Sequence, residues 1–327
     1  MRAAWYDNRG PAHEVLVLGQ LPTPDPGPGE VRIKMRYSGM SPGDVKKRSG
    51  WLGSPMPFPR VIPHSDGAGV VDAVGQGVNR SRIGETVWCY GAQSYRAFGT
   101  AAEYTVVPSE LALTLPDDVS PEILQQAASL GIAGITGYRA VFADGSVNGL
   151  NVLVYGAAGG VGSIATQMAI RDGASVTAVV RTPEQREIVR SFGVKTALHD
   201  SDPDLVERIR QASPGGIHRV ADVDFNAHID INAEVIAVGG VISAYYSSND
   251  RPRIPYWKLG FADTTLRLLG SDDFPPAVKA GAATELTQAL VARQLKVTIA
   301  ERLTLNDIAV AHELVEHGTS GKVVISI

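Results

Sequence analysis

The sequence predicts an α/β protein in which a β-rich first part is followed by a doubly wound parallel sheet. The chain has 327 residues, and at roughly 150 residues per domain this length predicts two domains. Before Pro121 the apolar residues alternate with polar ones as they do in strands, whereas strand patterns alternate with helical patterns after it. The second arrangement is typical of parallel sheets with right-handed crossovers.

Strands are predicted throughout the first part of the chain. Apolar and basic side chains alternate over residues 31–37, which is the pattern of a strand with one side in water. The preceding segment, 21–30, holds four prolines and two glycines, and we expect it to be an extended connector. Further strands are expected at 68–74, 86–90 and 102–107, between turns that contain glycine or proline.

The second part of the chain alternates between the two patterns. Residues 151–155 form an apolar run typical of a buried strand, and apolar residues then recur with helical spacing over 161–169. Later strands are predicted at 175–180, 219–223 and 240–244, with helices at 183–192 and 229–238. This order predicts a doubly wound domain.

Two helices and a strand are predicted near the end of the chain. The helices are expected at 277–294 and 305–317. Thr304 and Asp307 have the spacing of a capping box, and Gly318 stands where the C′ residue of the second helix belongs. The β-branched run 322–327 comes too late for another crossover unit, so we expect it to return to the first domain.

Charge and composition exclude several classes of protein. The formal net charge of −4 gives no sequence-wide positive field for nucleic acid or anionic membranes. We find no run of roughly 18 apolar residues, as a membrane span requires, and no apolar leader segment. The single Cys89 excludes an intramolecular disulfide and a cysteine-rich zinc cluster. We therefore expect a cytoplasmic protein without a membrane or nucleic-acid partner.

A glycine-rich turn follows the strand predicted at 151–155. It reads Gly156-Ala157-Ala158-Gly159-Gly160-Val161-Gly162 and precedes a predicted helix. Glycines at such a place permit a tight turn and let a diphosphate approach the backbone and the positive helix end. The spacing, G-x-x-G-x-x-G, departs by one position from the usual G-x-G-x-x-G. The alternative is a glycine-rich turn without a ligand.

The end of the next predicted strand selects between the two nicotinamide dinucleotides. An acidic residue there would suit the ribose of NAD, whereas an arginine suits the 2′-phosphate of NADP. The chain has Arg181 and Thr182 at this place and no acid before Glu184. Arg181 can pair a phosphate with two hydrogen bonds and Thr182 can donate a hydroxyl, which favours NADPH. The alternative is an arginine that is merely solvated.

Seven ordered segments resemble the zinc-free quinone oxidoreductase and zeta-crystallin branch of the medium-chain dehydrogenase/reductase superfamily. They lie at 63–71, 84–87, 101–104, 115–120, 131–138, 156–162 and 321–322. The resemblance implies a GroES-like β-rich catalytic domain with an inserted Rossmann doubly wound parallel sheet. The implied borders are 1–121 for the first part, 122–264 for the NADP-binding domain and 265–327 for the return.

The residues at the positions of zinc ligands argue against a catalytic zinc. Zinc alcohol dehydrogenases carry a His and then a Glu in the segment similar to 63–69, where this chain has Ser65 and Asp66 and its His64 is displaced by one. Ser41 stands where those enzymes have their first cysteine ligand. We expect no metal site and interpret His64 as a hydrogen-bonded loop residue.

Because we expect no metal, the nicotinamide cofactor has to carry the chemistry. The resemblance implies that NADPH transfers hydride to a small electrophile, which is either a quinone or an α,β-unsaturated carbonyl. It places cofactor contacts in the glycine-rich turn and at Arg181, Asn226 and Tyr246, with Phe274 and Thr136 toward the nicotinamide. Without the family pattern, Asn226 could equally be a turn residue and Thr136 an ordinary helix hydroxyl. Tyr246 and Phe274 could equally be core aromatics. We predict Ser41, Lys46 and Thr136 as positioning residues.

The active-site loop of that branch often reads Asn-Pro-x-Asp-x-Tyr, and here residues 41–46 are Ser-Pro-Gly-Asp-Val-Lys. Ser41 can still donate a hydrogen bond, and Lys46 could favour acidic acceptors. The alternative for Lys46 is a solvated basic turn.

Two functional classes remain open. The first is an NADPH-dependent quinone or alkenal and enone reductase. The second is a non-enzymatic NADPH-binding protein, crystallin-like or regulatory, for which the resemblance also allows RNA affinity. The resemblance further implies a homodimer or tetramer, formed by sheet extension around residues 240–246.

Overall fold

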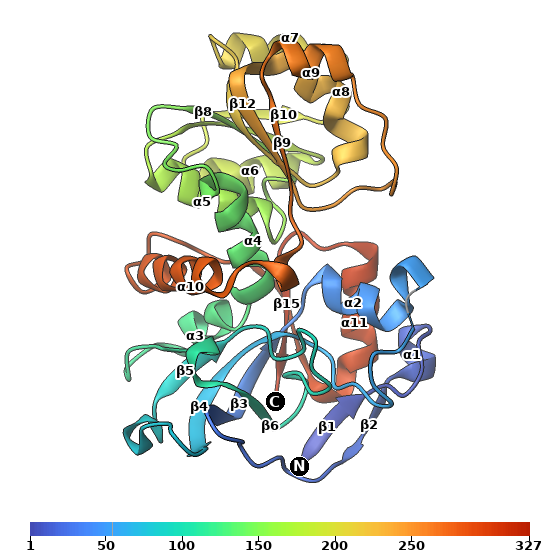
Figure 1. Cartoon of the computed structure of the whole chain (residues 1–327), viewed down its shortest axis with the longest axis vertical. Coiled ribbons are helices and arrows are strands. Elements are labelled where there is room, and N and C mark those ends of the chain that lie inside the picture. The colour runs from blue at the N-terminus through green and yellow to red at the C-terminus, as the bar shows by residue number, and fades with distance from the viewer. Residues whose placement is uncertain (54) are drawn as a thin grey trace. The chain divides into compact units, whose positions relative to one another are not determined.

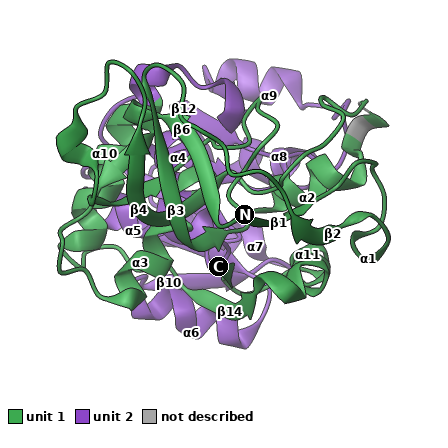
Figure 2. Cartoon of the chain, turned by 90° about the horizontal axis from the view of Figure 1, so that it is seen from below, with its two compact units in different colours: residues 1–133, 279–327 green, residues 134–278 purple. Residues whose placement is uncertain are grey.

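The computed structural model describes residues 1–53 and 55–327. The chain forms two compact units (Figures 1 and 2). Unit 1 comprises Met1–Ala133 and Lys279–Ile327, and unit 2 comprises Gly134–Val278. The predicted domain borders, 121/122 and 264/265, stay a prediction: α3 (Pro121–Ala127) packs with unit 1, and β13 (Thr265–Leu268) belongs to the sheet of unit 2.

Unit 1 is built on a seven-stranded sheet whose order is β14-β15-β3-β4-β5-β7, with β6 also paired to β3. Its strands are β3 (Glu30–Gly39), β4 (Asp66–Val74), β5 (Thr86–Cys89), β6 (Tyr104–Pro108), β7 (Ala112–Thr114), β14 (Ile299–Thr304) and β15 (Lys322–Ser326). The four strands predicted in this part are confirmed, and segment 21–29 carries neither helix nor strand. A separate two-stranded sheet pairs β1 (Arg2–Trp5) with β2 (Val17–Gln20).

The end of the chain returns to this sheet, as predicted. β15 pairs in antiparallel register with β3 and in parallel register with β14. Before it, Thr304 and Asp307 form the expected capping box, although the first turn is a 3-10 turn (Leu305–Asp307) and the α-helix α11 covers Ile308–His317. The other helices that contribute to unit 1 are α1 (Ala12–Val15), α2 (Pro42–Ser49), α3 and most of α10 (Pro276–Val291). Helix α4 (Gly131–Phe142) begins in unit 1 and continues into unit 2.

Unit 2 contains a six-stranded sheet in which every neighbouring pair is parallel. The order is β10-β9-β8-β11-β12-β13, so the chain reverses direction across the sheet between β8 and β11. The strands are β8 (Asn151–Tyr155), β9 (Ser175–Val180), β10 (Thr196–His199), β11 (Ile217–Asp222), β12 (Ile236–Ala244) and β13. The predicted doubly wound sheet is therefore confirmed, and the carboxyl ends of β8 and β11 mark the place where such sheets bind ligands.

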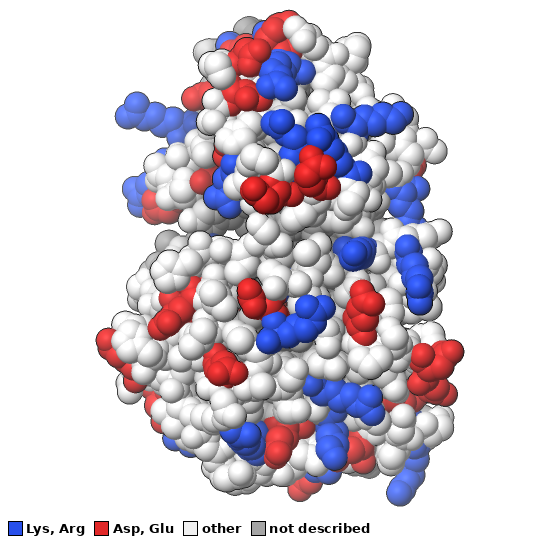
Figure 3. All heavy atoms as spheres, turned by 180° about the vertical axis from the view of Figure 1, so that it is seen from behind, with Lys and Arg blue, Asp and Glu red and all other residues white. Residues whose placement is uncertain are grey.

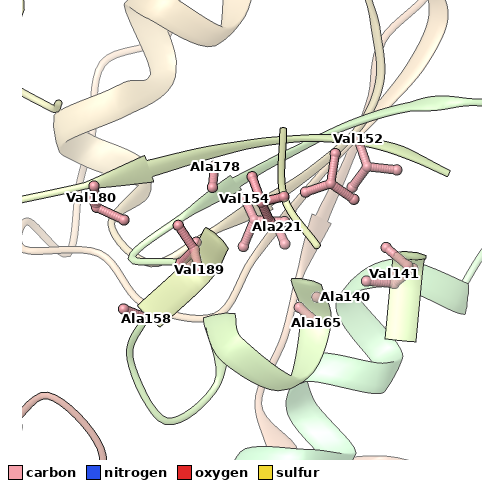
Figure 4. Packing of buried hydrophobic residues seen from close by; sticks show 14 of the residues in the cluster. Ala140, Val141, Val152, Val154, Ala158, Ala165, Ala178, Val180, Val189 and Ala221 are labelled. Carbon is pink, nitrogen blue, oxygen red and sulfur yellow. The ribbon is translucent and has the colours of Figure 1, made fainter. Parts of the chain in front are cut away.

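The helices of unit 2 cover both faces of its sheet. They are α5 (Gly162–Arg171), α6 (Pro183–Ser191), α7 (Leu205–Ala212), α8 (Phe225–Val235) and α9 (Tyr256–Phe261). The predicted helix 229–238 is wrong at its end, because residues 236–238 extend along β11 as the start of β12. Figure 4 shows small side chains of the strands, such as Val154 and Ala178, facing Ala165 and Val189 of the helices. Small side chains let helix and sheet approach closely.

In residues 1–53 and 55–327, no helix is long and apolar enough to cross a bilayer.

The remaining 3-10 turns are Trp51–Gly53, Arg80–Arg82, Ser109–Leu111 and Ser271–Asp273.

A chain of buried hydrogen bonds joins α2, α11 and the sheet of unit 1. Its successive contacts are Arg48 Nε to His312 Nδ1 at 3.4 Å, His312 Nε2 to His64 Nε2 at 3.1 Å, His64 Nδ1 to Ser38 Oγ at 2.8 Å, Ser38 Oγ to Thr100 Oγ1 at 2.7 Å, and Thr100 Oγ1 to the Asp66 carbonyl at 2.7 Å. Arginine can only donate, so His312 accepts at Nδ1 and donates from Nε2 to His64. His64 then donates from Nδ1 to Ser38, and its interpretation as a hydrogen-bonded residue is confirmed.

Both histidines are neutral in this arrangement. Burial lowers the pKa of His64 to about 3, with a smaller contribution from the Lys322 charge. Burial also holds the pKa of His312 well below its ordinary value, helped by His64 and Arg48. In the unfolded chain these groups take up protons near pH 6.5. The stability that they contribute is therefore complete above pH 6.5 and is lost as the pH falls toward 3.

We expect His64→Gln to reduce the pH dependence of folding in acid. The free energy of unfolding of the unmodified protein should fall below pH 6.5 by about 1.4 kcal/mol per pH unit for each neutral buried histidine. His64→Gln removes one such group and should flatten the slope accordingly. Urea denaturation at several pH values between 7 and 4 measures it. His13→Gln, at a side chain that is 67% exposed, is the control, and equal slopes in the two variants would contradict the assignment.

Candidate cofactor loop and active-site residues

The glycine-rich turn after β8 folds back tightly on itself. Gly156 has φ of 61°, and the amide of Gly159 donates to its carbonyl at 2.8 Å. A Cβ atom on Gly162 would lie 2.3 Å from that same carbonyl oxygen, a distance that side chains do not tolerate. Glycine is therefore required at Gly156 by its backbone angle and at Gly162 by close approach.

This turn presents unpaired donors at the start of α5. Val161 is the N-cap residue, and no side chain caps the helix. Within the described part of the chain, the amides of Gly160, Val161 and Gly162 have no hydrogen-bond acceptor. Gly159, Gly160 and Val161 are half-buried, whereas Ala158 packs into the core of unit 2. Free amides at a positive helix end fit an anionic group such as a diphosphate.

Arg181 and Thr182 lie at the carboxyl end of β9, as expected. The Arg181 side chain is exposed and forms no ion pair with any residue in 1–53 or 55–327. Two hydrogen bonds fix its backbone. The Arg181 amide donates to Gln185 Oε1 at 2.9 Å, and the Arg181 carbonyl accepts from His199 Nε2 at 2.5 Å. Thr182 is the N-cap of α6, and its hydroxyl accepts from the Gln185 amide at 3.2 Å. The guanidinium is thus available to an anion, while the threonine hydroxyl is already engaged by the helix.

Helix α4 carries Thr136 and contacts both the glycine-rich turn and Phe274. A Cβ on Gly137, next to Thr136, would lie 2.7 Å from the Val161 carbonyl, so α4 packs directly on the turn. Arg139 of the same helix lies over the Phe274 ring, 5.9 Å from its centroid. The side chains of Thr136 and Phe274 are 5% and 7% exposed. Helix α4 thus contacts the turn beside Thr136 and contacts Phe274 through Arg139, and the cofactor roles of Thr136 and Phe274 stay predictions.

Asn226 and Tyr246 follow β11 and β12 on the edge of the sheet that also carries the turn. Asn226 is exposed in the first turn of α8, and its Nδ2 donates to Ser248 Oγ at 3.4 Å. The Tyr246 carbonyl accepts from the Phe225 amide at 2.9 Å, which ties the two strand ends together. The carboxyl ends of parallel strands share one edge, so both predicted positions lie on the ligand-binding edge of unit 2.

The two remaining predicted residues, Ser41 and Lys46, lie on α2 of unit 1. Ser41 is the buried N-cap and forms a capping box with Asp44, whose Oδ2 accepts from the Ser41 amide at 2.7 Å. Lys322 Nζ donates to Ser41 Oγ at 2.8 Å. Lys46 Nζ lies over the Trp51 ring, 4.8 Å from its centroid, a cation–π contact. The positive charge of Lys46 is therefore held at the end of α2.

The residues at the family's zinc-ligand positions form a different kind of cluster. Ser41 accepts from Lys322, and Asp66 accepts from the Ile132 amide at 2.8 Å. Cys89 is buried, and burial raises the pKa of its thiol above the ordinary value, which disfavours the thiolate. Across residues 1–53 and 55–327, no group of three or more His, Cys, Asp or Glu side chains could hold a metal ion.

Sequence reasoning missed Lys322 as a partner of Ser41, and missed Arg48 and His312 as partners of His64. For Lys322 a signal was present, because a single charge opens an otherwise uncharged terminal run. The other two contacts join residues that no local pattern connects.

Comparison with known proteins places this geometry in a family. Residues 27–117 match the alcohol dehydrogenase GroES-like domain, and residues 160–254 match the zinc-binding dehydrogenase family. Human quinone oxidoreductase is 28% identical over 321 residues, covering 95% of this chain and 94% of that protein. Alcohol dehydrogenase 1 of Emericella nidulans is 32% identical, but the match spans only 62% of this chain and 63% of that protein.

Solved structures resemble the chain over its whole length. The structure of mycobacterial Rv1454c complexed with NADPH is 28% identical and superposes with a TM-score of 0.85, covering 100% of both chains. Together with the two matching domains, this similarity extends through both units. The chain therefore belongs to the medium-chain dehydrogenase/reductase superfamily, in its quinone oxidoreductase branch.

Proposed function

We propose that the protein is an NADPH-dependent, zinc-independent oxidoreductase that transfers hydride to quinones or α,β-unsaturated carbonyls. The observation that carries the proposal is the set of free amides at Gly160, Val161 and Gly162, at the point where the sheet order reverses. The similar mycobacterial protein is complexed with NADPH, and the human relative is a quinone oxidoreductase. The acceptor is a small-molecule electrophile.

The residues present fit NADPH. In this proposal the turn of residues 156–162 holds the diphosphate, with Ala158 fixing the turn in the core, and the free guanidinium of Arg181 pairs the 2′-phosphate. Thr182 orients the start of α6 beside it. Asn226, Tyr246 and Phe274 line the remaining path of the cofactor, and Thr136 lies toward the nicotinamide. The cofactor supplies the hydride, and the protein supplies position and hydrogen bonds.

Zinc-independence follows from the side chains that replace the ligands. Quinones and enones accept hydride without a metal on their oxygen, because the negative charge that develops there is delocalised and needs only hydrogen-bond donors. Ser41 is proposed as one such donor. Selection of acidic acceptors by Lys46 stays a prediction, and the Trp51 contact is compatible with either interpretation of Lys46.

We expect the protein to oxidise NADPH in the presence of 9,10-phenanthrenequinone or an alkenal. Prolonged dialysis against a chelator should leave the rate unchanged. The loss of NADPH absorbance measures turnover, and NADPH fluorescence measures binding in the same samples. A fluorescence change without turnover for any acceptor would instead indicate the non-enzymatic, crystallin-like class.

We expect Arg181→Ala to weaken NADPH binding and to leave NADH binding nearly unchanged. A hydrogen-bonded contact to a charged group is worth about 1.5–3 kcal/mol, so the dissociation constant for NADPH should rise about 10- to 100-fold. Fluorescence titration with both cofactors measures the effect. Arg190→Ala, at the far end of α6, is the control. An unchanged preference in Arg181→Ala would remove the argument for the 2′-phosphate.

We also propose a homo-oligomer that forms through the free edge of the unit 2 sheet. The predicted location, residues 240–246, is wrong, because β12 pairs with β11 on one side and β13 on the other. The two edge strands are β10 and β13, and we choose β13 because Leu268 on it is 74% exposed. Beside it Trp257 and Phe261 of α9 are 68% and 82% exposed. Two identical edges can pair about a two-fold axis and bury these side chains.

The proposed oligomer predicts a solution mass at least twice the 34.6 kDa of one chain. Charges in the interface should weaken it, so Trp257→Asp with Phe261→Asp should lower the mass toward that of one chain. Light scattering after size-exclusion chromatography measures it. Val310→Asp, at an exposed side chain of unit 1, is the control. A monomeric unmodified protein would contradict the proposal.

A cytoplasmic location and the absence of a nucleic-acid partner stay predictions. Figure 3 shows basic and acidic side chains on the face that it draws, and the formal net charge of −4 is what supports the prediction of no nucleic-acid partner.

A further inference from the structure

A lysine and a serine that lie 281 positions apart in the sequence meet inside unit 1. Lys322 opens β15, and Ser41 follows β3 by two residues. The antiparallel register pairs Val324 with Gly39, and the Met40 amide donates to the Val323 carbonyl at 3.1 Å. This register fixes Lys322 Nζ at 2.8 Å from Ser41 Oγ, with both side chains 4% exposed or less.

The Lys322 ammonium lies among two carboxylates and a neutral imidazole. Burial lowers the pKa of Lys322 below its ordinary value, and the negative charges of Asp66 and Asp44 oppose this effect without cancelling it. The Lys322 charge in turn helps to keep His64 neutral. Lys322 is thus a stronger acid than a solvent-exposed lysine and still has counter-charges close by.

The Ser41 hydroxyl accepts one hydrogen bond from Lys322 and still carries its own donor hydrogen. A hydroxyl has two acceptor positions and one donor hydrogen. Lys322 donates to Ser41 Oγ, whereas the Asp44 amide donates to the Ser41 backbone carbonyl at 2.9 Å. In the described ranges 1–53 and 55–327, no acceptor receives the hydrogen of the Ser41 hydroxyl. A buried donor hydrogen without a partner is costly, so a ligand oxygen that accepted it would be favoured.

We propose that Lys322 is the proton source for the oxygen of the reduced acceptor and that the Ser41 hydroxyl passes the proton on. This inference rests on the proposed function. As hydride from NADPH forms a bond to the acceptor carbon, the π electron pair moves to the acceptor oxygen. That oxygen takes the Ser41 hydrogen, and Ser41 Oγ takes a proton from Lys322 Nζ. The acceptor gains two electrons and one proton with the hydride, NADPH becomes NADP⁺, and water later reprotonates the neutral amine.

The experiment compares two acceptors that differ in how much they need the proton. An enone gives a strongly basic enolate, whereas tetrachloro-1,4-benzoquinone gives a weakly basic anion. General acid catalysis contributes about 100-fold or more. Lys322→Met and Ser41→Ala should therefore lower kcat for the enone by about 100-fold and kcat for the chlorinated quinone by much less. Lys296→Met, at an exposed side chain of unit 1, should change neither.

Lys322→Arg separates proton transfer from charge. Arginine keeps the positive charge and the donor but does not release a proton near neutral pH. It should stay as slow on the enone as Lys322→Met. Full rescue by arginine, or equal losses on both acceptors, would overturn the proposal. Because the proposed NADPH contacts lie in unit 2, the folding of unit 1 is checked separately: urea denaturation should show that every variant is folded under the assay conditions.

A measurement without turnover gives an independent readout. NMR titration of the Lys322 Nζ signal in the unmodified protein should give a pKa below that of Lys296, and Ser41→Ala should shift it. An ordinary pKa for Lys322, insensitive to Ser41, would contradict the relay. If the unmodified protein reduces neither acceptor, the proposed function itself has failed, which is distinguishable from each of these results.

Discussion

The structure of unit 1 depends on how its buried charges are satisfied away from water. Lys322 donates to Ser41 near two carboxylates, and Arg48, fully buried, donates to the Gly10 carbonyl and to Glu316. Removing one partner of such a pair leaves an uncompensated charge, which destabilises a protein far more than the pair itself stabilises it. These contacts tie α2 to β15 through Ser41 and to α11 through Glu316, so the position of Ser41 follows from charge compensation as much as from packing.

Unit 2 meets a different constraint, since it must bring a helix end and a strand end together closely enough to hold an anion. Glycine at 156 and 162 lets the turn close, and alanines and valines between sheet and helices keep the layers near one another. The free amides that result are a cost in the absence of a ligand, because they are polar groups without protein partners. A bound diphosphate would accept hydrogen bonds from these amides, and these bonds would contribute to its binding affinity.

Local patterns of apolar and polar residues predict part of this architecture. β8 and β9 begin and end where periodicity predicts, because buried strands carry uninterrupted apolar runs. β10 and β13 escaped prediction: β10 has no apolar–polar alternation, and β13 alternates over only four residues. α2 was missed because its residues are mostly polar, and Lys46, Lys47 and Arg48 suggest a solvated turn. The pairs His64–His312 and Ser41–Lys322 join positions 248 and 281 residues apart, which only the closed sheet reveals.

The discontinuity of unit 1 has a consequence for the order of folding. Residues 134–278 are contiguous and can form their sheet while synthesis continues, since proteins fold domain by domain on the ribosome. Unit 1 lacks the strand between β3 and β14 until residues 322–326 have been made. The edge of β3 that β15 covers stays unpaired until then. A nascent chain stalled before residue 322 should therefore carry a finished dinucleotide fold beside an unfinished catalytic one.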